Sequence, residues 1–418
     1  MKTQTLFKKI LTIRSDFPIF THAVHKNRLL CYLDNAATTH KPQSVIDGMV
    51  HFYSQDNATV GRAIYTSGER ATSLYEAARE TVQHFIGAQN ASEIVFTRGA
   101  TEGINAIAHA WAAHCLHAGD EIVLTELEHH ANLLPWQRVS QQTGAVIKFI
   151  PIHADGSLDY TDLDTIITHK TKLVATTHVS NALGTTVDID RIITRARHVG
   201  ARILIDASQS APHQRINVTT LDPDFLVFSG HKMLGPTGIG VLYVKKSVHH
   251  ELVPYQCGGG MVFNATWQTA SWLKMPHLLE AGTPAIAQAI GLASAISYLE
   301  QIDFKELAIH EAALCSRLID GLLKLLPIRI LGPIAQLRTQ GHLVSFVVNG
   351  LHAHDVAAYL DHKGICVRAG HHCAQPLAQT LGIEASVRVS FYLYNTQQEV
   401  DFLLETLTQI ISHLPDMK

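Results

Sequence analysis

Short β-rich runs alternate with helical patterns between residues 90 and 245, and this alternation leaves few possible folds. Two of the amphipathic stretches, residues 131–143 and 188–199, are each followed by glycine, the usual residue after a helix. Alternation of this kind predicts an α/β fold with a mostly parallel sheet that is covered by helices on both faces. The expected strands are residues 93–97, 121–125, 146–150, 173–177, 202–205, 225–228 and 240–244.

A smaller α/β unit is expected after a connector helix at residues 285–300, because strand and helix patterns alternate again there. The glycine-rich stretch at residues 258–282 predicts irregular structure. The expected strands of the smaller unit are residues 343–348 and 365–368, and its expected helices are residues 304–326, 353–361 and 396–411.

Composition excludes several classes of protein. A chain of 418 residues with 46% hydrophobic and 17% charged residues can bury a large core in two domains. The net charge of −3 argues against nucleic acid as a partner, and no apolar run approaches the ~18 residues of a membrane span. The first residues lack the features of a secretory signal, and the six cysteines form no C-x-x-C pair. Reduced thiols in a cytoplasmic protein are therefore expected.

Chemically useful side chains follow two of the expected strands. Lys232 comes just after one apolar run, and Asp206 and Gln209 come just after another. Ligands of parallel sheets bind beyond the carboxyl ends of the strands. Lysine, acid and glutamine at neighbouring strand ends are the groups that an enzyme using pyridoxal 5'-phosphate (PLP) requires: the lysine forms a Schiff base, and the carboxylate keeps the pyridine nitrogen protonated. Singly, such a lysine is usually a surface charge and such an acid is as often a helix cap or a core ion pair, but the combination favours the cofactor.

A glycine turn at residues 99–103 follows a strand and begins a helix, where free amides bind phosphate. Such a turn alone often marks only a loop, but Ser229 and His231 offer further donors. His129 is placed to stack on a flat cofactor ring. The pair His129 and His130 also suggests a metal, but no third ligand follows at suitable spacing, so we expect no metal site.

Cys373 lies between Gly370 and Pro376, which predicts a loop. A single cysteine is more often a small buried hydrophobic residue, as expected for Cys366, but an arginine and two histidines near Cys373 favour the nucleophilic thiolate. Arg388 lies in an alternating strand pattern; it is either a surface residue or a group that grips a substrate carboxylate.

Together these motifs resemble the type II cysteine desulfurases of the class V aminotransferase superfamily, of the kind found in the Suf system. The resemblance extends from about residue 16 to residue 401. It implies the PLP-dependent transferase fold of type I, which is similar to aspartate aminotransferase. The matching runs are residues 32–39, 128–132, 178–181, 229–238, 280–284, 370–374 and 394–396.

The resemblance implies roles for individual residues. Lys232 would carry the cofactor and Cys373 would accept sulfur, while Thr283 would reach the phosphate of a neighbouring subunit in a homodimer. Other predicted contacts are Asp206, Gln209 and His129 with the ring; Thr101, Ser229 and His231 with the phosphate; Asn181 and Arg388 with the substrate carboxylate; and Asn35 and Ala36 with the substrate.

The implied reaction converts L-cysteine to L-alanine and leaves a persulfide on Cys373. The sulfur would serve iron–sulfur cluster assembly or another delivery route, through a small acceptor protein of the SufE, CsdE or SufU type. The implied division is an N-terminal segment at residues 1–30 packing with the small domain, a PLP-binding domain at residues 31–295, and a small domain at residues 296–418 that carries the cysteine loop.

Two departures from the family pattern keep alternatives open. The usual His-Arg-Gly-x-His run is replaced by Val-Gly-Arg-Ala-Ile-Tyr at residues 60–65, and Ala100 stands where a threonine is usual, which removes a hydroxyl worth about 1 kcal/mol if it bonds phosphate. One alternative is a selenocysteine lyase, in which selenocysteine turnover survives Cys373→Ala. Others are a related PLP lyase or epimerase, or a relative with lost activity that acts as a binding partner and carries no Schiff base.

Overall fold

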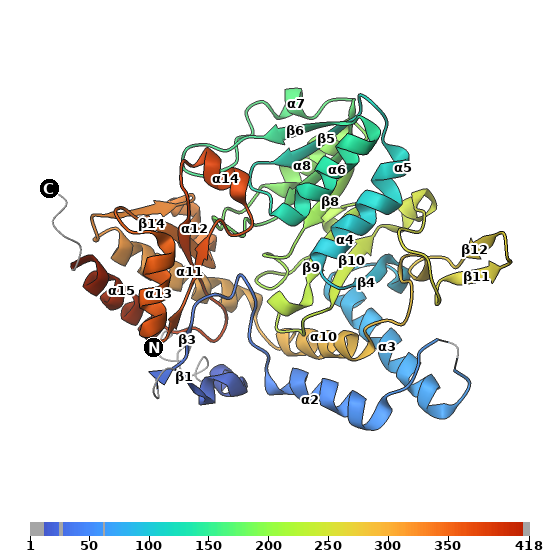
Figure 1. The fold of residues 1–418 in the computed structure, drawn as a ribbon, viewed down its shortest axis with the longest axis horizontal. Helices are drawn as coiled ribbons and strands as arrows, with labels where there is room; N and C mark the ends of the chain where they lie inside the picture. The colour runs from blue at the N-terminus through green and yellow to red at the C-terminus, as the bar shows by residue number, and fades with distance from the viewer. Residues whose placement is uncertain (1–11, 25–27, 62, 413–418) are drawn as a thin grey trace.

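The computed structural model describes residues 12–24, 28–61 and 63–412, and its centre is a seven-stranded sheet (Figure 1). The strand order is β4-β10-β9-β8-β7-β5-β6. All neighbouring pairs are parallel except those of β10, which is antiparallel to both β4 and β9. The predicted mostly parallel sheet is therefore confirmed. Its strands are β4 (Ile94–Thr97), β5 (Glu121–Thr125), β6 (Val146–Ile150), β7 (Thr171–Thr177), β8 (Arg202–Asp206), β9 (Phe225–Ser229) and β10 (Gly240–Val244).

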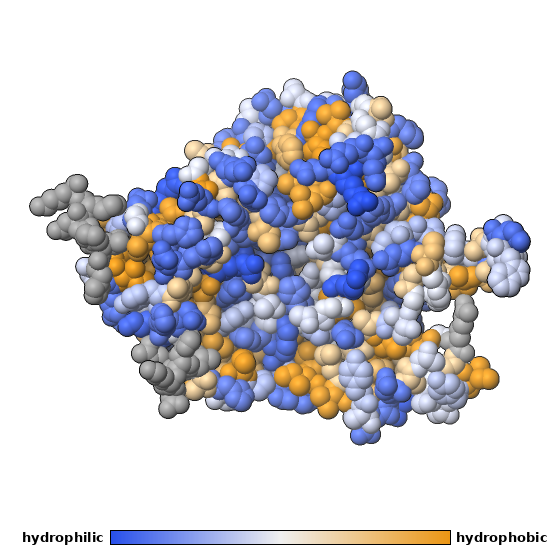
Figure 2. All heavy atoms as spheres, viewed as in Figure 1, coloured by the Kyte–Doolittle hydropathy of each residue, from blue (hydrophilic) through white to orange (hydrophobic). Residues whose placement is uncertain are grey.

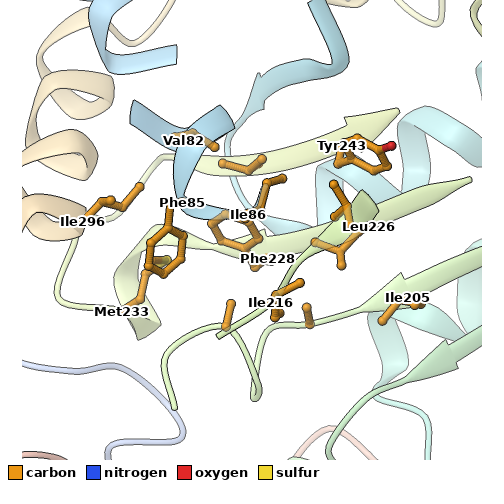
Figure 3. Packing of buried hydrophobic residues seen from close by; sticks show 14 of the residues in the cluster. Val82, Phe85, Ile86, Ile205, Ile216, Leu226, Phe228, Met233, Tyr243 and Ile296 are labelled. Atoms are coloured by element: carbon orange, nitrogen blue, oxygen red, sulfur yellow. The ribbon is translucent and has the colours of Figure 1, made fainter. Parts of the chain in front are cut away.

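Both faces of this sheet are buried, because successive side chains of a strand point to opposite faces. In β9, Leu226 and Phe228 belong to one hydrophobic cluster, and Phe225 and Val227 belong to the other. Figure 3 shows Phe228 packed beside Phe85 of α3 in the first cluster. Helices α3 (Thr66–Phe85), α8 (Ile189–His198) and α10 (Ile286–Leu299) supply the first cluster; α4 (Ala100–Ile107) and α6 (Leu134–Thr143) supply the second.

The second unit is built on a four-stranded antiparallel sheet, coloured orange to red in Figure 1. The strand order is β13 (Ile328–Leu331), β14 (Leu343–Val348), β17 (Ser386–Ser390) and β16 (Arg368–Gly370). A third hydrophobic cluster joins this sheet to its helices. The main helices of the unit are α11 (Phe304–Leu322), α12 (Ile334–Gln340), α13 (Ala353–His362), α14 (Gln375–Thr380) and α15 (Gln397–Ser412).

The strand predicted at residues 365–368 is in fact two strands. β15 (Ile365–Cys366) pairs in parallel with β3 (Cys31–Tyr32), whereas β16 begins at Arg368 and pairs with β17. The chain passes from one sheet to the other at Val367. Cys366 lies on a strand as expected, but it is only half-buried.

The prediction of irregular structure at residues 258–282 is wrong in part. β11 (Val262–Ala265) and β12 (Ala270–Trp272) form an antiparallel hairpin that projects from the body of the molecule (Figures 1 and 2). Within it Phe263 is 75% exposed and Trp267 is fully exposed. Since the hairpin buries neither face in this chain, it has no alternation of apolar and polar residues by which to recognise it.

The described part of the N-terminal segment contacts the C-terminal part of the chain. Arg14 donates to the carbonyl oxygen of Tyr394 at 3.0 Å and pairs with Glu399 at 3.0 Å, and the rings of Phe17 and Tyr394 lie 4.8 Å apart. Residues 1–11 and 25–27 of that segment lie outside the described residues. The predicted boundary at residues 295/296 falls within α10 and stays a prediction.

The remaining elements are short or connect the two units. Among the described residues, no helix is both long and apolar enough to cross a membrane, and the face in Figure 2 is a mosaic of hydrophilic and small hydrophobic areas. These elements are η1 (Pro18–Thr21), β1 (Ala23–Val24), β2 (Arg28–Leu29), α2 (Gln43–His51), η2 (Phe52–Asp56), η3 (Ala91–Glu93), η4 (Ala108–Ala112), α5 (Ala113–Cys115), η5 (His130–Asn132), α7 (Leu163–Ile166), α9 (Val218–Leu221), η6 (Gly230–Lys232), η7 (Lys246–Glu251) and η8 (His277–Leu279).

Candidate active site

A cavity of about 190 Å³ lies at the carboxyl ends of β7, β8 and β9. The cysteine loop of the second unit forms part of its wall. All but two of the side chains predicted for the site line this cavity: Ala36, Thr101, His129, Asn181, Asp206, Gln209, Ser229, His231, Lys232, Cys373 and Arg388.

Lys232 ends the 3-10 turn η6, which follows β9 directly and directs its side chain into the cavity. Burial lowers the pKa of Lys232 from 10.5 to about 8, although the nearby Asp206 carboxylate acts in the opposite direction. Roughly a tenth of the amine is therefore unprotonated at pH 7, compared with less than about one part in a thousand for an ordinary lysine. An unprotonated amine is the form that reacts with an aldehyde.

Asp206 is the last residue of β8 and is 6% exposed. One of its carboxylate oxygens accepts a hydrogen bond from the Ser208 N–H at 2.9 Å. Within the described residues Asp206 has no ion pair, although a buried carboxylate normally has a cationic partner. A cationic group bound in the cavity would supply that partner.

His129 caps the start of the turn η5 and lines the cavity with a neutral ring. Burial, followed by the positive charge of Lys232, lowers the pKa of His129 to about 4. Its Nδ1 accepts from the N–H of Ala131 at 3.0 Å, so the ring proton lies on Nε2. A neutral, fixed ring of this kind suits stacking on a flat ligand.

The turn before α4 passes very close to β10. A Cβ added at Gly240 would lie 2.5 Å from the Cα of Gly99, so this approach requires glycine. The N–H of Ala100 donates to Ser229 Oγ at 2.9 Å, which leaves the hydroxyl proton of Ser229 free to donate elsewhere. The first-turn amides of α4, including that of Thr101, lack partners within the helix and suit an anion.

The loop of Cys373 has an unusual backbone. His372 and Cys373 are consecutive non-glycine residues with φ of 53° and 55°, a left-handed conformation that surrounding structure must enforce. Asn181 Nδ2 donates to the carbonyl oxygen of His372 at 2.6 Å, and the N–H of His130 donates to that of Cys373 at 2.7 Å. The side chain of Cys373 itself is exposed at the cavity.

Arg388 is buried, so the interpretation as a surface strand residue is excluded. Its Nη2 pairs with Asp34 at 3.0 Å, and its Nη1 donates to the carbonyl oxygen of Asn181 at 2.8 Å. The buried Nε of Arg388 has no hydrogen-bond partner among the residues that the structure describes. A guanidinium with a free N–H at a cavity wall suits recognition of a carboxylate.

Two predicted residues lie away from the cavity. The side chain of Asn35 is buried, donates to the carbonyl oxygen of Ser390 at 2.7 Å and accepts from the Tyr394 hydroxyl, so it supports the end of β17. Thr283 lines a second cavity of about 430 Å³ together with Val60 and Gly61, from the stretch that departs from the family pattern.

Sequence analysis missed several residues of the site. Arg368 lines the cavity and is the register partner of Arg388 on the neighbouring strand, so both side chains lie on one face of that sheet. The strand patterns around residues 368 and 388 were the sequence feature that could have indicated Arg368. His342, which contacts Gln209, gave no signal because it only precedes an expected strand. The part of the chain that the structure describes contains no group of three or more histidine, cysteine or acidic residues that could hold a metal ion.

The aminotransferase class V family model matches residues 31–403. The chain belongs to this family. It is 44% identical over 402 residues to a probable cysteine desulfurase of Streptomyces coelicolor, which covers 95% of this chain and 96% of the relative.

Solved structures agree with this assignment. The cysteine desulfurase CsdA of Escherichia coli has a TM-score of 0.89 at 37% identity and covers 97% of this chain and 99% of its own. The apo cysteine desulfurase of Thermococcus onnurineus NA1 has a TM-score of 0.91 at 40% identity and covers 97% and 98%, respectively. The predicted type I fold of the class V family is therefore confirmed.

Proposed function

We propose that this class V family member is a PLP-dependent cysteine desulfurase, which converts L-cysteine to L-alanine and transfers the sulfur to Cys373. The observation that carries the proposal is that one cavity holds an amine, a buried carboxylate and a thiol, contributed by Lys232, Asp206 and Cys373. The curated relative from Streptomyces coelicolor, similar over nearly its whole length, has the same activity in its name.

The residues of the cavity fit pyridoxal phosphate. Lys232 would hold the aldehyde carbon, and the buried carboxylate of Asp206 would bind the pyridine nitrogen. The neutral ring of His129 would stack on the cofactor. Hydroxyl and amide donors of Thr101 and Ser229 suit the phosphate. His231 would add the N–H of its ring, which stays neutral because burial lowers its pKa to about 4. When bound, this cofactor withdraws electrons from the substrate Cα, which weakens the bonds around that carbon.

Arg388 and Asn181, which both line the cavity, would bind the carboxylate of L-cysteine. The Nε of Arg388 is buried without a partner in the described part of the chain, and a carboxylate oxygen would complete its hydrogen bonding. The ion pair of Arg388 with Asp34 fixes the plane of the guanidinium before substrate binds. This geometry would orient the substrate sulfur toward the cysteine loop.

Lys232 and Cys373 carry the chemical steps of the proposal. The amine of Lys232 would accept the Cα proton of the substrate, because a pKa of about 8 allows it to take up and return a proton near neutral pH. Cys373 Sγ, as the thiolate, would then bond to the substrate sulfur while the Cβ–S bond breaks. The electron pair of that bond would stay with Cβ, which takes up a proton in place of the one that the thiol lost. The products are L-alanine and a persulfide on Cys373, so free sulfide is not released.

Two partners follow from the proposal. A persulfide on the exposed Cys373 is accessible to the thiol of a small acceptor protein of the SufE, CsdE or SufU type. A homodimer is supported by the exposed aromatic residues Phe263 and Trp267 of the β11–β12 hairpin, which a second copy would cover, and by Thr283 at a separate cavity. The need for a free thiol favours the cytoplasm.

The proposal is tested by exposing the wild-type protein, loaded with cofactor, to L-cysteine. Alanine should form, and the peptide that contains Cys373 should gain the mass of one sulfur atom. Alanine formation without added sulfur on that peptide would contradict the role of Cys373. A colourless protein whose absorbance is unchanged by borohydride would contradict the whole proposal.

A further inference from the structure

A row of buried polar side chains leads away from the cavity behind Gln209. His342 Nε2 lies 3.2 Å from Gln209 Oε1, and the ring of His342 stacks on that of His213 at 3.8 Å with 17° between the planes. His213 Nδ1 lies 2.8 Å from a carboxyl oxygen of Glu311. All four side chains are buried. Gln209 and His213 follow β8, whereas His342 and Glu311 belong to the second unit.

The direction of the hydrogen bond between His342 and Gln209 follows from its surroundings. Burial lowers the pKa of His342 well below its usual value, and the charges of Arg388 and Lys232 act in the same direction, so its ring is neutral. Gln209 Nε2 donates to the carbonyl oxygen of Ala36 at 2.8 Å, so the other end of the amide, Oε1, faces His342. A carbonyl oxygen only accepts, and therefore His342 Nε2 carries the proton.

This arrangement decides which atom Gln209 offers to the cavity. An amide nitrogen has two protons, and the carbonyl oxygen of Ala36 takes one of them. The second remains available, and Gln209 lines the cavity. Turning the amide over would set its oxygen against the Ala36 oxygen and would force the His342 proton onto Nδ1, so at least one buried hydrogen bond would be lost.

We infer that His342 is a positioning residue, which orients Gln209 by donating to its oxygen so that an N–H of the amide points at an oxygen of the bound ligand. The inference deepens the proposed function, on which it rests, since that oxygen would be the phenolic oxygen of pyridoxal phosphate. An N–H at this oxygen competes with the proton on the Lys232–cofactor linkage. It therefore lowers the pH at which the linkage loses that proton.

The test compares variants of the cofactor-loaded protein without substrate. His342→Phe keeps an aromatic ring against His213 but has no N–H, and His342→Gln supplies an amide N–H. The absorbance of the bound cofactor is titrated against pH, and its dissociation constant is measured. His342→Phe should raise the midpoint by about 0.5–1 pH unit and weaken cofactor binding about fivefold, and His342→Gln should recover most of both effects.

Two controls separate orientation of Gln209 from a general structural role. In a Gln209→Ala background, adding His342→Phe should shift the midpoint no further, because the Gln209 amide through which His342 acts is absent. Tyr392→Phe removes a hydroxyl from the same cluster. The ring of Tyr392 lies 5.1 Å from that of His213, and its hydroxyl donates to the carbonyl oxygen of Pro212. This substitution should leave the midpoint unchanged. Equal shifts by His342→Phe in both backgrounds, or no shift in either, would overturn the inference.

A second measurement needs no variant at position 342 to fold. In protein labelled with ¹⁵N-histidine, the NMR spectrum should show neutral His342 with its proton on Nε2. The signal that changes in the Gln209→Ala variant is assigned to the His342 Nε2–H that donates to Gln209. A proton on Nδ1 alone would overturn the inference. If wild-type protein forms no borohydride-reducible linkage while His342 carries Nε2–H, the proposed function fails and the orientation of Gln209 stands.

Discussion

The backbone N–H of His130 donates to the carbonyl oxygen of Cys373 at 2.7 Å, which ties the cysteine loop to the segment that carries His129. A second hydrogen bond joins the same two segments in the opposite direction, since the N–H of Gln375 donates to His130 Nε2 at 3.0 Å. The thiol thus sits on a loop that is exposed but held at both sides. This arrangement suits a group that reacts inside the cavity and then passes its product to an outside acceptor.

Replacing the thiol should separate cofactor binding from sulfur transfer. In Cys373→Ser the oxygen cannot form a persulfide, but none of the proposed cofactor contacts changes. We expect normal yellow colour and no added sulfur on the peptide, measured by absorbance and mass spectrometry after exposure to cysteine. Cys257→Ser is the matched control because Cys257 is the other exposed thiol. Sulfur transfer that is lost equally in both variants would contradict this prediction.

The left-handed backbone at Cys373 predicts that glycine at this position stabilises the fold although it removes the thiol. Glycine adopts a φ of 55° without the strain of a Cβ, but it also makes the unfolded chain more flexible. Because Cys373 is exposed, glycine sacrifices little buried surface. We expect Cys373→Gly to be more stable than Cys373→Ser by about 0.5–1 kcal/mol in denaturant unfolding, while both variants are inactive. A less stable Cys373→Gly would show that the loop does not strain its backbone.

Removing the amine should abolish the covalent link to the cofactor. Lys232→Ala should form no alanine and show no borohydride-sensitive absorbance when pyridoxal phosphate is added. Lys41 provides an internal control, because burial also lowers its pKa to about 8, yet its Nζ donates to the carbonyl oxygens of Thr39 and His231 rather than lining the cavity. After reduction of the wild type, the label should lie on the Lys232 peptide. A label on Lys41 instead would contradict the assignment.

The sequence predicted the large sheet and most of the site because both depend on local patterns. Buried parallel strands are continuous apolar runs, and residues such as Asp206 and Lys232 follow them at a fixed edge. Other features depend on contacts between distant segments and leave no local pattern. The support that Asn35 gives to β17, the contact of His342 with Gln209 and the exposed β11–β12 hairpin are of this second kind.

The pKa of Lys232 predicts how the protein without cofactor takes up pyridoxal phosphate. Only the unprotonated amine adds to the aldehyde, so the rate should rise with pH through about 8, whereas free lysine titrates near 10.5. Asp206 raises this pKa, so Asp206→Asn should move the midpoint to lower pH. The rate of the absorbance change is measured against pH, with a simple alkylamine as the reference. A midpoint near 10.5, or an upward shift in Asp206→Asn, would contradict the structure.

The geometry of Arg388 predicts a selective effect on substrate binding. Arg388→Lys keeps the positive charge beside Asp34 but loses the planar group whose Nη1 donates to the carbonyl oxygen of Asn181. It also loses the buried Nε, which has no partner among the described residues and is proposed to bind the substrate carboxylate. Loss of a charge-assisted hydrogen bond of about 1.5–3 kcal/mol should raise KM for L-cysteine roughly 10- to 150-fold. The colour of the bound cofactor should not change, since no proposed cofactor contact is removed. Arg317→Lys, at an exposed pair with Asp401, is the control and should leave KM unchanged. A fall in kcat with an unchanged KM would instead place Arg388 in the chemical step.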